Sequence, residues 1–320
     1  MTDLPSGQEN KAYGPSVLYA GIDGGGTKTN ISILDKDGRI VFSGSYGPSN
    51  LLNGDEFEDN VLLMFRDAFL NLKDRLRIKT VINITAGFAG TSSDDYETRF
   101  RNVFKKAALG YDLSIDHLNI NSDALLALNV YFADKPGLLL ISGTGSICYG
   151  KDQKGDLFRT GGFGYLIDDA GSGFWFGKEA VKAALRSHYH YGQGSVLEEM
   201  VREHFGVQRT EDIFDIIYKG DPRSVISSAS ELVFTAAENG CKVAGEIVES
   251  GATELIGLVR NCSEHIGRKA PFVVLHGSVF RQEKLVGLIK KDLIDDMNIY
   301  ISDKRIDLEA ANSMLDQNDL

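Results

Sequence analysis

The chain has 320 residues, of which 42% are hydrophobic and 25% are charged, and its formal net charge is −11. This balance is typical of a globular protein large enough for two domains, and it excludes disordered and fibrous proteins. The acidic excess gives no basic surface for nucleic acid, and neither a membrane-spanning run nor a signal-peptide core is present. We therefore expect a cytoplasmic protein that binds neither nucleic acid nor membrane.

The first half of the chain predicts a mixed α/β sheet. Residues 1–16 are polar, and we expect them to form a flexible leader. Three β-prone runs then form an antiparallel meander, and two helix–strand units that require parallel crossovers follow. In chain order, these strands and helices are expected at residues 17–22, 30–34, 39–45, 55–76, 80–85, 98–109 and 118–120.

The second half starts the same scheme again. A strand, a glycine-rich turn and a second strand are followed by two long helices and a last apolar strand. These elements are expected at residues 137–142, 143–146, 147–150, 172–187, 242–266 and 272–276. The sequence thus predicts an α/β fold of two lobes, residues 17–124 and 125–305, with a cleft between them. It leaves open whether a C-terminal helix at 306–320 joins the first lobe.

The first glycine-rich loop, Gly24-Gly-Gly-Thr-Lys-Thr29, lies between two predicted strands, with Asp23 at the end of the first. Such a loop brings backbone N–H groups close to an anion, and a phosphate is the natural guest. Thr27 precedes Lys28, which excludes a Walker A loop, and the strand that follows excludes a Rossmann fingerprint. A flexible hairpin tip stays the alternative for this loop taken alone.

The second loop, Ile141-Ser-Gly-Thr-Gly-Ser146, favours the phosphate interpretation. Its glycines permit close approach, and the hydroxyls of Thr144 and Ser146 can donate to phosphate oxygens. Two such loops predict a clamp on one triphosphate, which suits phosphoryl transfer. Asp23 is the candidate for holding Mg²⁺ through its waters, with local turn hydrogen bonding as the alternative.

Asp123 ends a predicted strand, in Asn121-Ser-Asp123, and opens a helix expected at 124–131. A carboxylate at the carboxyl end of a strand is well placed to act as a catalytic base. Asp is also a preferred N-cap residue, so capping stays an alternative for Asp123.

Six short motifs follow one another along the chain. They are Asp23-Gly-Gly-Gly-Thr-Lys-Thr29, Ser122-Asp-Ala124, Ile141-Ser-Gly-Thr-Gly-Ser146, Gly161-Gly-Phe-Gly164, Asp169-Ala-Gly-Ser172 and Gly277-Ser-Val279. In this order they resemble the N-acetylglucosamine kinase family, in the BadF/BadG-type ATPase branch of the sugar kinase, actin and heat-shock chaperone superfamily. The resemblance implies two ribonuclease-H-like lobes that close over ATP, Mg²⁺ and a sugar, and a homodimer would suit it.

The resemblance also implies roles for single residues, with Asp123 as the base that deprotonates the sugar 6-hydroxyl. The expected ATP contacts are Gly25, Gly26, Thr27, Lys28, Gly143, Thr144, Gly145, Ala237, Gly277 and Ser278. The expected sugar contacts are Asn50, Gly87, Ala89, Asp123, Ser146, Gly162, Phe163 and Asp169. Core packing is the alternative for Phe163. Departures from the family pattern occur at Cys241, where Asp is common, and at Asp168-Asp-Ala-Gly-Ser172, where Gly-Asp-Glu-Gly-Ser is common.

We therefore expect an ATP-dependent kinase that phosphorylates the 6-hydroxyl of an N-acetylated amino sugar, with N-acetylglucosamine preferred. Kinases of N-acetylmuramic acid, glucosamine or N-acetylmannosamine stay open, because only the sugar contacts would differ, and the sequence identifies no cation for a lactyl carboxylate. The activator ATPase of a 2-hydroxyacyl-CoA dehydratase is an alternative of another class, but it needs cluster cysteines. Cys148, Cys241 and Cys262 contain no CxxC pair. A non-catalytic sugar sensor is the last alternative, and the presence of Asp123 argues against it.

Overall fold

The computed structural model describes residues 16–50, 54–76, 79–90, 96–266 and 271–316. Within these residues the chain forms two compact units. The first contains the chain up to Asp123 and the segment from Arg305 onward, and the second contains Ala124–Lys304. The leader expected at residues 1–16 lies outside the described residues except for Ser16.

The first unit is built on a five-stranded sheet in the order β3-β2-β1-β4-β5. The strands are β1 (Val17–Gly24), β2 (Thr29–Asp35), β3 (Ile40–Tyr46), β4 (Thr80–Phe88) and β5 (Leu113–Ser122). The pairs β1–β2 and β2–β3 are antiparallel, whereas β1–β4 and β4–β5 are parallel. The meander and the parallel crossovers predicted from the sequence are therefore confirmed.

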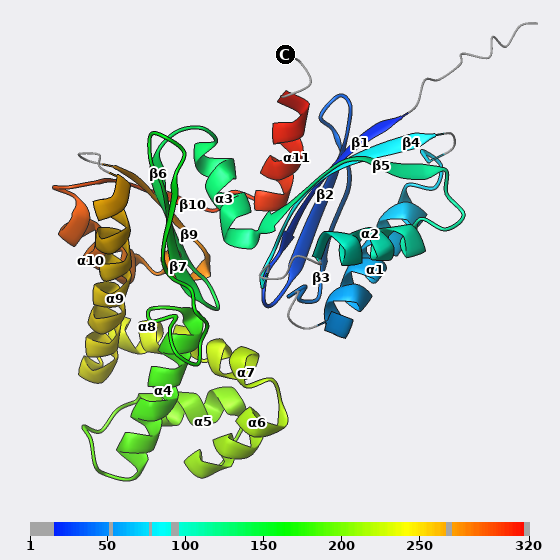
Figure 1. Cartoon of the computed structure of the whole chain (residues 1–320). Helices are drawn as coiled ribbons and strands as arrows, with labels where there is room; N and C mark the ends of the chain where they lie inside the picture. The colour runs from blue at the N-terminus through cyan, green and yellow to red at the C-terminus, as the bar shows by residue number, and fades with distance from the viewer. Residues whose placement is uncertain (1–15, 51–53, 77–78, 91–95, 267–270, 317–320) are drawn as a thin grey trace, which may run out of the picture. The chain divides into compact units, whose positions relative to one another are not determined.

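Helices cover both faces of this sheet. The alternate residues Leu18, Ala20 and Ile22 of β1 belong to a buried core shared with α1 (Gly54–Asn71) and α2 (Tyr96–Ala107). Tyr19 points to the other face, where it packs with residues of α11 (Ile306–Asp316). Figure 1 shows α11 against β1 and β2, although the chain reaches it almost 300 residues after β1.

A polar network fastens α11 to the sheet. The buried Ser32 hydroxyl donates to the Asp307 carboxylate at 2.7 Å, and Arg305 donates to Asp307 at 2.6 Å and to Ser43 at 2.9 Å. At Gly21 the helix backbone comes so close that an added Cβ would lie 1.8 Å from the Asp307 carbonyl oxygen. Glycine is therefore required at this position of β1.

The second unit repeats the sheet of the first. Its order is β8-β7-β6-β9-β10, with β6–β7 and β7–β8 antiparallel and β6–β9 and β9–β10 parallel. The strands are β6 (Gly137–Ser142), β7 (Ser146–Lys151), β8 (Leu157–Gly161), β9 (Phe272–His276) and β10 (Asn298–Ser302). Two sheets with the same order and the same strand directions confirm the pseudo-repeat predicted from the glycine-loop hairpins.

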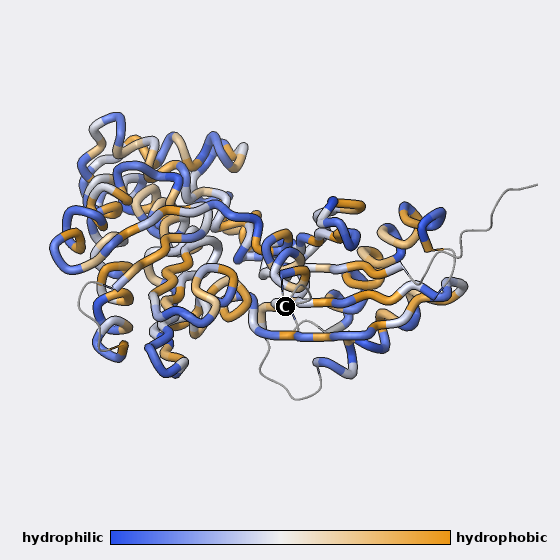
Figure 2. Tube along the Cα trace, turned by 90° about the horizontal axis from the view of Figure 1, so that it is seen from above, coloured by the Kyte–Doolittle hydropathy of each residue, from blue (hydrophilic) through white to orange (hydrophobic). Residues whose placement is uncertain are grey.

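Helices of the second unit also lie on both sides of its sheet. α9 (Lys242–Ile266) and α10 (Glu283–Leu293) form a buried core with the strands, and α3 (Asp123–Phe132) lies on the other face. There, the Lys151 ammonium of β7 donates to the Asn129 side chain of α3 at 2.8 Å. Figure 2 shows that hydrophobic segments follow the strands, whereas the outer turns are mostly hydrophilic.

A helical segment is inserted between β8 and α9. It contains α4 (Gly173–His188), α5 (Leu197–Phe205), α6 (Ile213–Lys219), α7 (Pro222–Ser228) and α8 (Ser230–Glu238). The short 3₁₀ helices are η1 (Thr210–Asp212), before α6, and η2 (Ser278–Arg281), after β9. The sequence predicted only α4 and α9 in this part of the chain, and it also missed α10 and the edge strands β8 and β10.

Two expected boundaries differ from the structure. The helix expected at 55–76 ends at Asn71, and a turn follows it, in which Arg75 and Leu76 both donate to the Leu72 carbonyl, at 2.7 and 3.0 Å. The strand expected at 118–120 runs from Leu113 to Ser122. The register between β4 and β5 shifts between Ile82 and Ile84 and breaks the alternation of polar and apolar residues in β5. The first half of β5 could therefore not be recognised from the sequence pattern.

Candidate functional site

Three parallel strands of the first sheet end together. Asp23 of β1 lies opposite Gly87 of β4, and Gly87 lies opposite Asn121 of β5. α3 begins with Asp123, directly after β5. The carboxyl edge of the sheet therefore carries Asp23 and Asp123, the residues that the sequence predicted for Mg²⁺ and for base catalysis.

Negative charge is concentrated around Asp23. Desolvation, together with the carboxylates of Asp123 and Asp307, raises the pKa of its carboxyl to about 7, and Lys28 opposes this rise. The carboxylate of Asp123 therefore lies close enough to Asp23 for its negative charge to raise the pKa of Asp23. A cation would relieve this repulsion, so the edge is suited to a metal-bound phosphate.

The first glycine-rich loop is held on three sides by backbone hydrogen bonds. Gly25 donates to the Lys28 carbonyl at 2.9 Å, which closes the loop, and Ala89 donates to the Gly24 carbonyl at 2.8 Å. Ser49 donates to the Gly25 carbonyl at 3.3 Å. Gly24 packs so tightly that an added Cβ would lie 2.3 Å from the Phe88 ring. The loop is therefore a fixed structure and not a flexible hairpin tip.

The segment that carries Asn50 is fixed against this loop by residues that the sequence analysis missed. The buried Thr29 hydroxyl donates to the Gly47 carbonyl at 2.9 Å and lies 2.7 Å from the Ser49 hydroxyl. Asn60 of α1 donates to the Pro48 carbonyl at 2.6 Å. Of the expected sugar contacts, Ala89 thus bonds directly to the first glycine-rich loop, and Asn50 directly follows Ser49, which also bonds to it.

The second glycine-rich loop is fixed to the start of α4. Gly173 donates to the Gly143 carbonyl at 2.7 Å, and Phe174 donates to the Thr144 carbonyl at 3.3 Å. The buried Ser146 hydroxyl donates to the Ala170 carbonyl at 2.8 Å. Its proton is thereby engaged in this structure, and its oxygen is still able to accept a hydrogen bond from a ligand.

Gly277 and Ser278, which follow β9, lie beside this loop. Gly277 has a φ of 119°, and an added Cβ would lie 2.3 Å from the Ser142 carbonyl oxygen. The Ser278 side chain is exposed. Ala237, another expected ATP contact, packs in the hydrophobic core of the second unit, and its carbonyl accepts a hydrogen bond from Lys284 at 3.4 Å. Its methyl group is therefore committed to packing.

Asp169 has the most constrained environment of the expected sugar contacts. It is 4% exposed and has a φ of 63°, an uncommon value for a residue other than glycine. Desolvation raises the pKa of its carboxyl, although the backbone N–H of Ser146 and the guanidinium of Arg223 counteract the rise. Arg223 was not identified from the sequence, because nothing in its local pattern links α7 to the glycine-rich loop.

Phe163 is 64% exposed, so core packing, the alternative interpretation of this residue, is wrong. Its backbone N–H donates to the Asp168 carboxylate at 3.0 Å, and the Arg159 guanidinium lies 4.4 Å from the centre of its ring. Gly162 has a φ of 76° and packs on Ile147. The ring is thus held near a turn, with one face stacked on a cation and the rest accessible.

The described part of the chain gathers no cluster of three or more His, Cys, Asp or Glu side chains that could hold a metal ion. Its helices are all too short or too polar to cross a bilayer. Cys148 and Cys262 are buried in the second unit, and Cys241 is half-buried. Burial raises the pKa of the Cys148 thiol.

Comparison with known proteins identifies relatives over most of the chain. The family model of the BadF/BadG/BcrA/BcrD ATPases matches residues 20–305. The N-acetylmuramic acid/N-acetylglucosamine kinase of Clostridium acetobutylicum is 31% identical over 258 residues, which are 80% of this chain and 82% of that protein. The N-acetyl-D-glucosamine kinase of Dictyostelium discoideum is 25% identical over 295 residues, which are 87% of this chain and 91% of that protein.

Solved structures with low sequence identity share the fold. A protein from Chromobacterium violaceum, provisionally named an N-acetylglucosamine kinase, superimposes with a TM-score of 0.73 at 20% identity, over 94% of this chain and 99% of its own. A ROK family glucokinase from Streptomyces griseus, solved with glucose and AMPPNP, gives a TM-score of 0.55 at 16% identity, over 94% and 99% of the two chains. The mixed α/β architecture is therefore that of two-lobed, actin-like sugar kinases.

Proposed function

The chain belongs to the BadF/BadG/BcrA/BcrD ATPase family, and we propose that it is an ATP-dependent kinase of N-acetylated amino sugars, with N-acetylglucosamine as the preferred substrate. One observation carries the proposal. Asp123 lies at the carboxyl edge of the first sheet together with Asp23 and a rigid glycine-rich loop. The names of the two curated relatives support the substrate class.

Asp123 acts as the general base in the proposed reaction. Its carboxylate accepts the proton of the sugar 6-hydroxyl while the hydroxyl oxygen attacks the γ-phosphorus of ATP. The new oxygen–phosphorus bond forms as the bond to the β,γ-bridging oxygen breaks, and ADP leaves. Catalysis of this kind depends on positioning and on charge neutralisation, which the rigid glycine-rich loops can provide through backbone N–H groups.

Mg²⁺ belongs to the proposal because the residues present fit it. Desolvation and two further carboxylates raise the pKa of Asp23, so a divalent cation would relieve an unfavourable arrangement. Asp23 would hold the ion through its waters, since Mg²⁺ keeps much of its hydration. When bound, the ion would neutralise phosphate charge, while Thr27 and Lys28 stay exposed for the phosphate oxygens.

For the sugar, we propose contacts from Asn50, from the turn at Gly87–Ala89, and from Asp169 with Gly162–Phe163. Amide and carboxylate groups bind neighbouring sugar hydroxyls in pairs, and the exposed ring of Phe163 can cover an apolar sugar face. The buried, constrained carboxylate of Asp169 is typical of a side chain that recognises a ligand.

The other classes of function fit the structure less well. An activator ATPase needs accessible thiolates for an iron–sulfur cluster, whereas Cys148 and Cys262 are buried in a core and burial raises the pKa of Cys148. A sugar sensor needs no base, yet Asp123 lies at the edge of the sheet where a base is required. A cytoplasmic location and a homodimer complete the proposal, and light scattering after gel filtration tests the dimer.

The test is a coupled ADP-release assay with Mg-ATP and a panel of sugars: N-acetylglucosamine, N-acetylmuramic acid, N-acetylmannosamine, glucosamine and glucose. We expect turnover with N-acetylglucosamine and weaker or no turnover with glucosamine and glucose, which lack the acetyl group. ATP hydrolysis that none of the sugars stimulates would refute the kinase and favour the activator class.

A further inference from the structure

Arg223 carries a cationic group for which the described part of the chain provides no hydrogen-bonding partner. It lies in the first turn of α7, and its guanidinium makes no hydrogen bond or ion pair with any described residue. Its Nε atom is buried and unsatisfied. A buried donor without a partner is costly, so the described residues leave the hydrogen-bonding capacity of this guanidinium unused.

The guanidinium lies beside the second glycine-rich loop and the expected sugar-binding carboxylate. A methyl group added at Gly145 would lie 3.4 Å from a terminal nitrogen of Arg223 and 2.8 Å from an oxygen of Asp169. On another side, the Tyr165 ring centre is 5.7 Å from the guanidinium carbon. Both Arg223 and Asp169 therefore border the same small space above Gly145.

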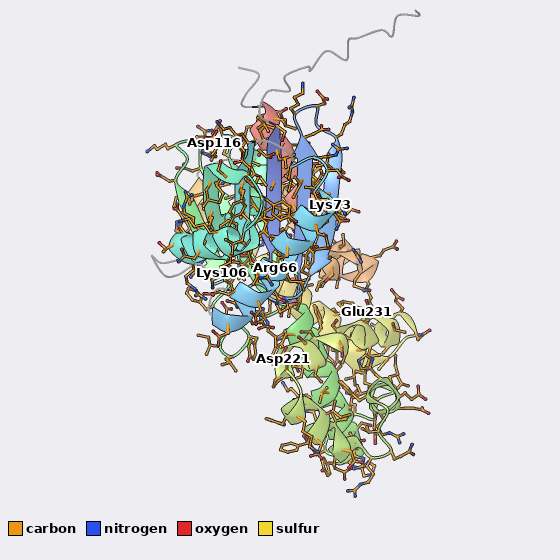
Figure 3. The ribbon with its side chains drawn as sticks, turned by 90° about the vertical axis from the view of Figure 1, so that its right-hand side faces the viewer. Arg66, Lys73, Lys106, Asp116, Asp221 and Glu231 are labelled. Carbon is orange, nitrogen blue, oxygen red and sulfur yellow. The ribbon has the colours of Figure 1, made fainter. Side chains whose placement is uncertain are left out.

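The second nearby carboxylate is already engaged. Asp221 caps α7 by accepting hydrogen bonds from the backbone N–H groups of Arg223 at 3.3 Å and Ser224 at 3.0 Å. Figure 3 labels Asp221 at the start of this helix. The carboxylate that caps the helix makes no ion pair with the guanidinium, and one terminal nitrogen of Arg223 lies beside Gly145 and Asp169.

We propose that Arg223 binds the carboxylate of an acidic N-acetylated sugar, such as the lactyl group of N-acetylmuramic acid, and so extends the specificity of the site beyond neutral sugars. This inference rests on the proposed kinase function. A sugar carboxylate that approaches Asp169 would be repelled by that residue unless a cation lay beside it. Arginine is suited to this role because its planar fork matches a carboxylate in two hydrogen bonds.

Neutral sugars carry no charged group that could pair with a cation at this position. An N-acetylglucosamine held by Asp169 presents only uncharged hydroxyl and acetamido groups, which bind a guanidinium more weakly than a paired carboxylate does. N-acetylmuramic acid and N-acetylglucosamine differ only by the lactyl ether, and ATP is common to both reactions. A comparison of the two sugars therefore distinguishes a role of Arg223 in sugar recognition from a role in binding ATP.

The experiment compares the wild type with Arg223→Met and Arg223→Lys in steady-state kinetics with Mg-ATP and either N-acetylmuramic acid or N-acetylglucosamine. Loss of a charge-assisted pair should lower kcat/KM for N-acetylmuramic acid by roughly 10- to 100-fold, mainly through KM. For N-acetylglucosamine we expect a change of about threefold or less, and Arg223→Lys should recover part of the loss. Arg209→Met, which removes a 69% exposed arginine from the same unit, is the matched control.

Each other outcome overturns the inference. Equal losses with both sugars would show that Arg223 serves ATP or the fold. A wild type that phosphorylates N-acetylglucosamine but not N-acetylmuramic acid would refute the carboxylate site while leaving the kinase intact. Absence of turnover with either sugar would refute the kinase itself, and the carboxylate site with it.

Discussion

At the scale of single residues, the proposed transfer depends most on Asp123, because among the described residues no other carboxylate directly follows a strand at the edge that carries Asp23. We expect Asp123→Asn to lower kcat by about 10²- to 10⁴-fold, the usual contribution of a general base. Sugar binding measured by calorimetry should persist, since the amide keeps the shape. The control is Asp116→Asn, which changes an exposed residue of β5, the strand that precedes Asp123 (Figure 3). Near-normal turnover of Asp123→Asn would exclude a role of Asp123 as the base.

Asp23 makes stability depend on pH. Its folded pKa of about 7 lies above the ordinary value of 3.8, so between these pH values the folded state holds a proton that the unfolded state has lost. The stability of the ligand-free protein should therefore fall as pH rises from about 4 to 7, with the full penalty above 7. Asp23→Asn should remove on the order of 2 kcal/mol of this dependence between pH 5 and pH 8, measured by urea unfolding. If the unfolding free energies of the wild type and Asp23→Asn changed with pH in parallel, the raised pKa of Asp23 would be contradicted.

The roles of single residues were only partly accessible from the sequence. The sequence singled out Asp23, Asp123 and Asp169 as candidates because each belongs to a short motif beside glycines or at a strand end. Arg223 and Asn60 received no role, because they act through contacts across the fold and not through a local pattern. Thr29 lies in the first glycine motif, but its hydrogen bonds to the segment before Asn50 could not be read from the motif.

At the scale of secondary-structure elements, Gly277 is the position where β9 must turn past the second glycine-rich loop. Gly277→Ala would strain a φ of 119° and push Cβ to 2.3 Å from the Ser142 carbonyl oxygen. We expect a loss of about 1–3 kcal/mol in unfolding free energy and a raised KM for ATP, measured by urea titration and kinetics. Gly257→Ala in α9, where an added Cβ meets nothing within 4 Å, should be neutral or stabilising.

The elements that could be predicted share one property, which is a strong and uninterrupted pattern. β6, β9 and α9 begin and end where their apolar runs predict. β8 and β10 are edge strands with alternating, half-exposed residues, and α5–α7 are short helices, so neither type produces a clear periodic signal. Packing on the central strands, and not local propensity, decides their conformation.

At the scale of the whole molecule, duplication explains why the sequence could predict the architecture. The same strand order occurs in both sheets, and each sheet places a glycine-rich loop between its first two strands in the chain. The return of the chain to the first unit could not be predicted, because it depends on a close approach at Gly21 and on a network of Arg305, Asp307 and Ser32. None of these residues forms a recognisable motif.

This return makes the first unit depend on the last described helix. A chain that ends at Lys304 would lack α11 and would uncover Tyr19 and Leu34, which are buried against it. It would also leave the buried Ser32 hydroxyl without the Asp307 carboxylate. We therefore expect the first unit to lose its cooperative unfolding transition, while the second unit, with its own larger core, keeps one.

The single tryptophan of the chain allows the two units to be followed separately. Trp175 lies in α4 of the second unit and packs against its core, so its fluorescence reports that unit alone. In the truncated chain the fluorescence midpoint in urea should stay close to that of the full chain, whereas circular dichroism should show a large early loss of structure. A chain that ends at Asp316, and so keeps α11, is the control. If truncation moved both signals together, the units would stabilise each other, and if it moved neither, α11 would be dispensable for the first unit.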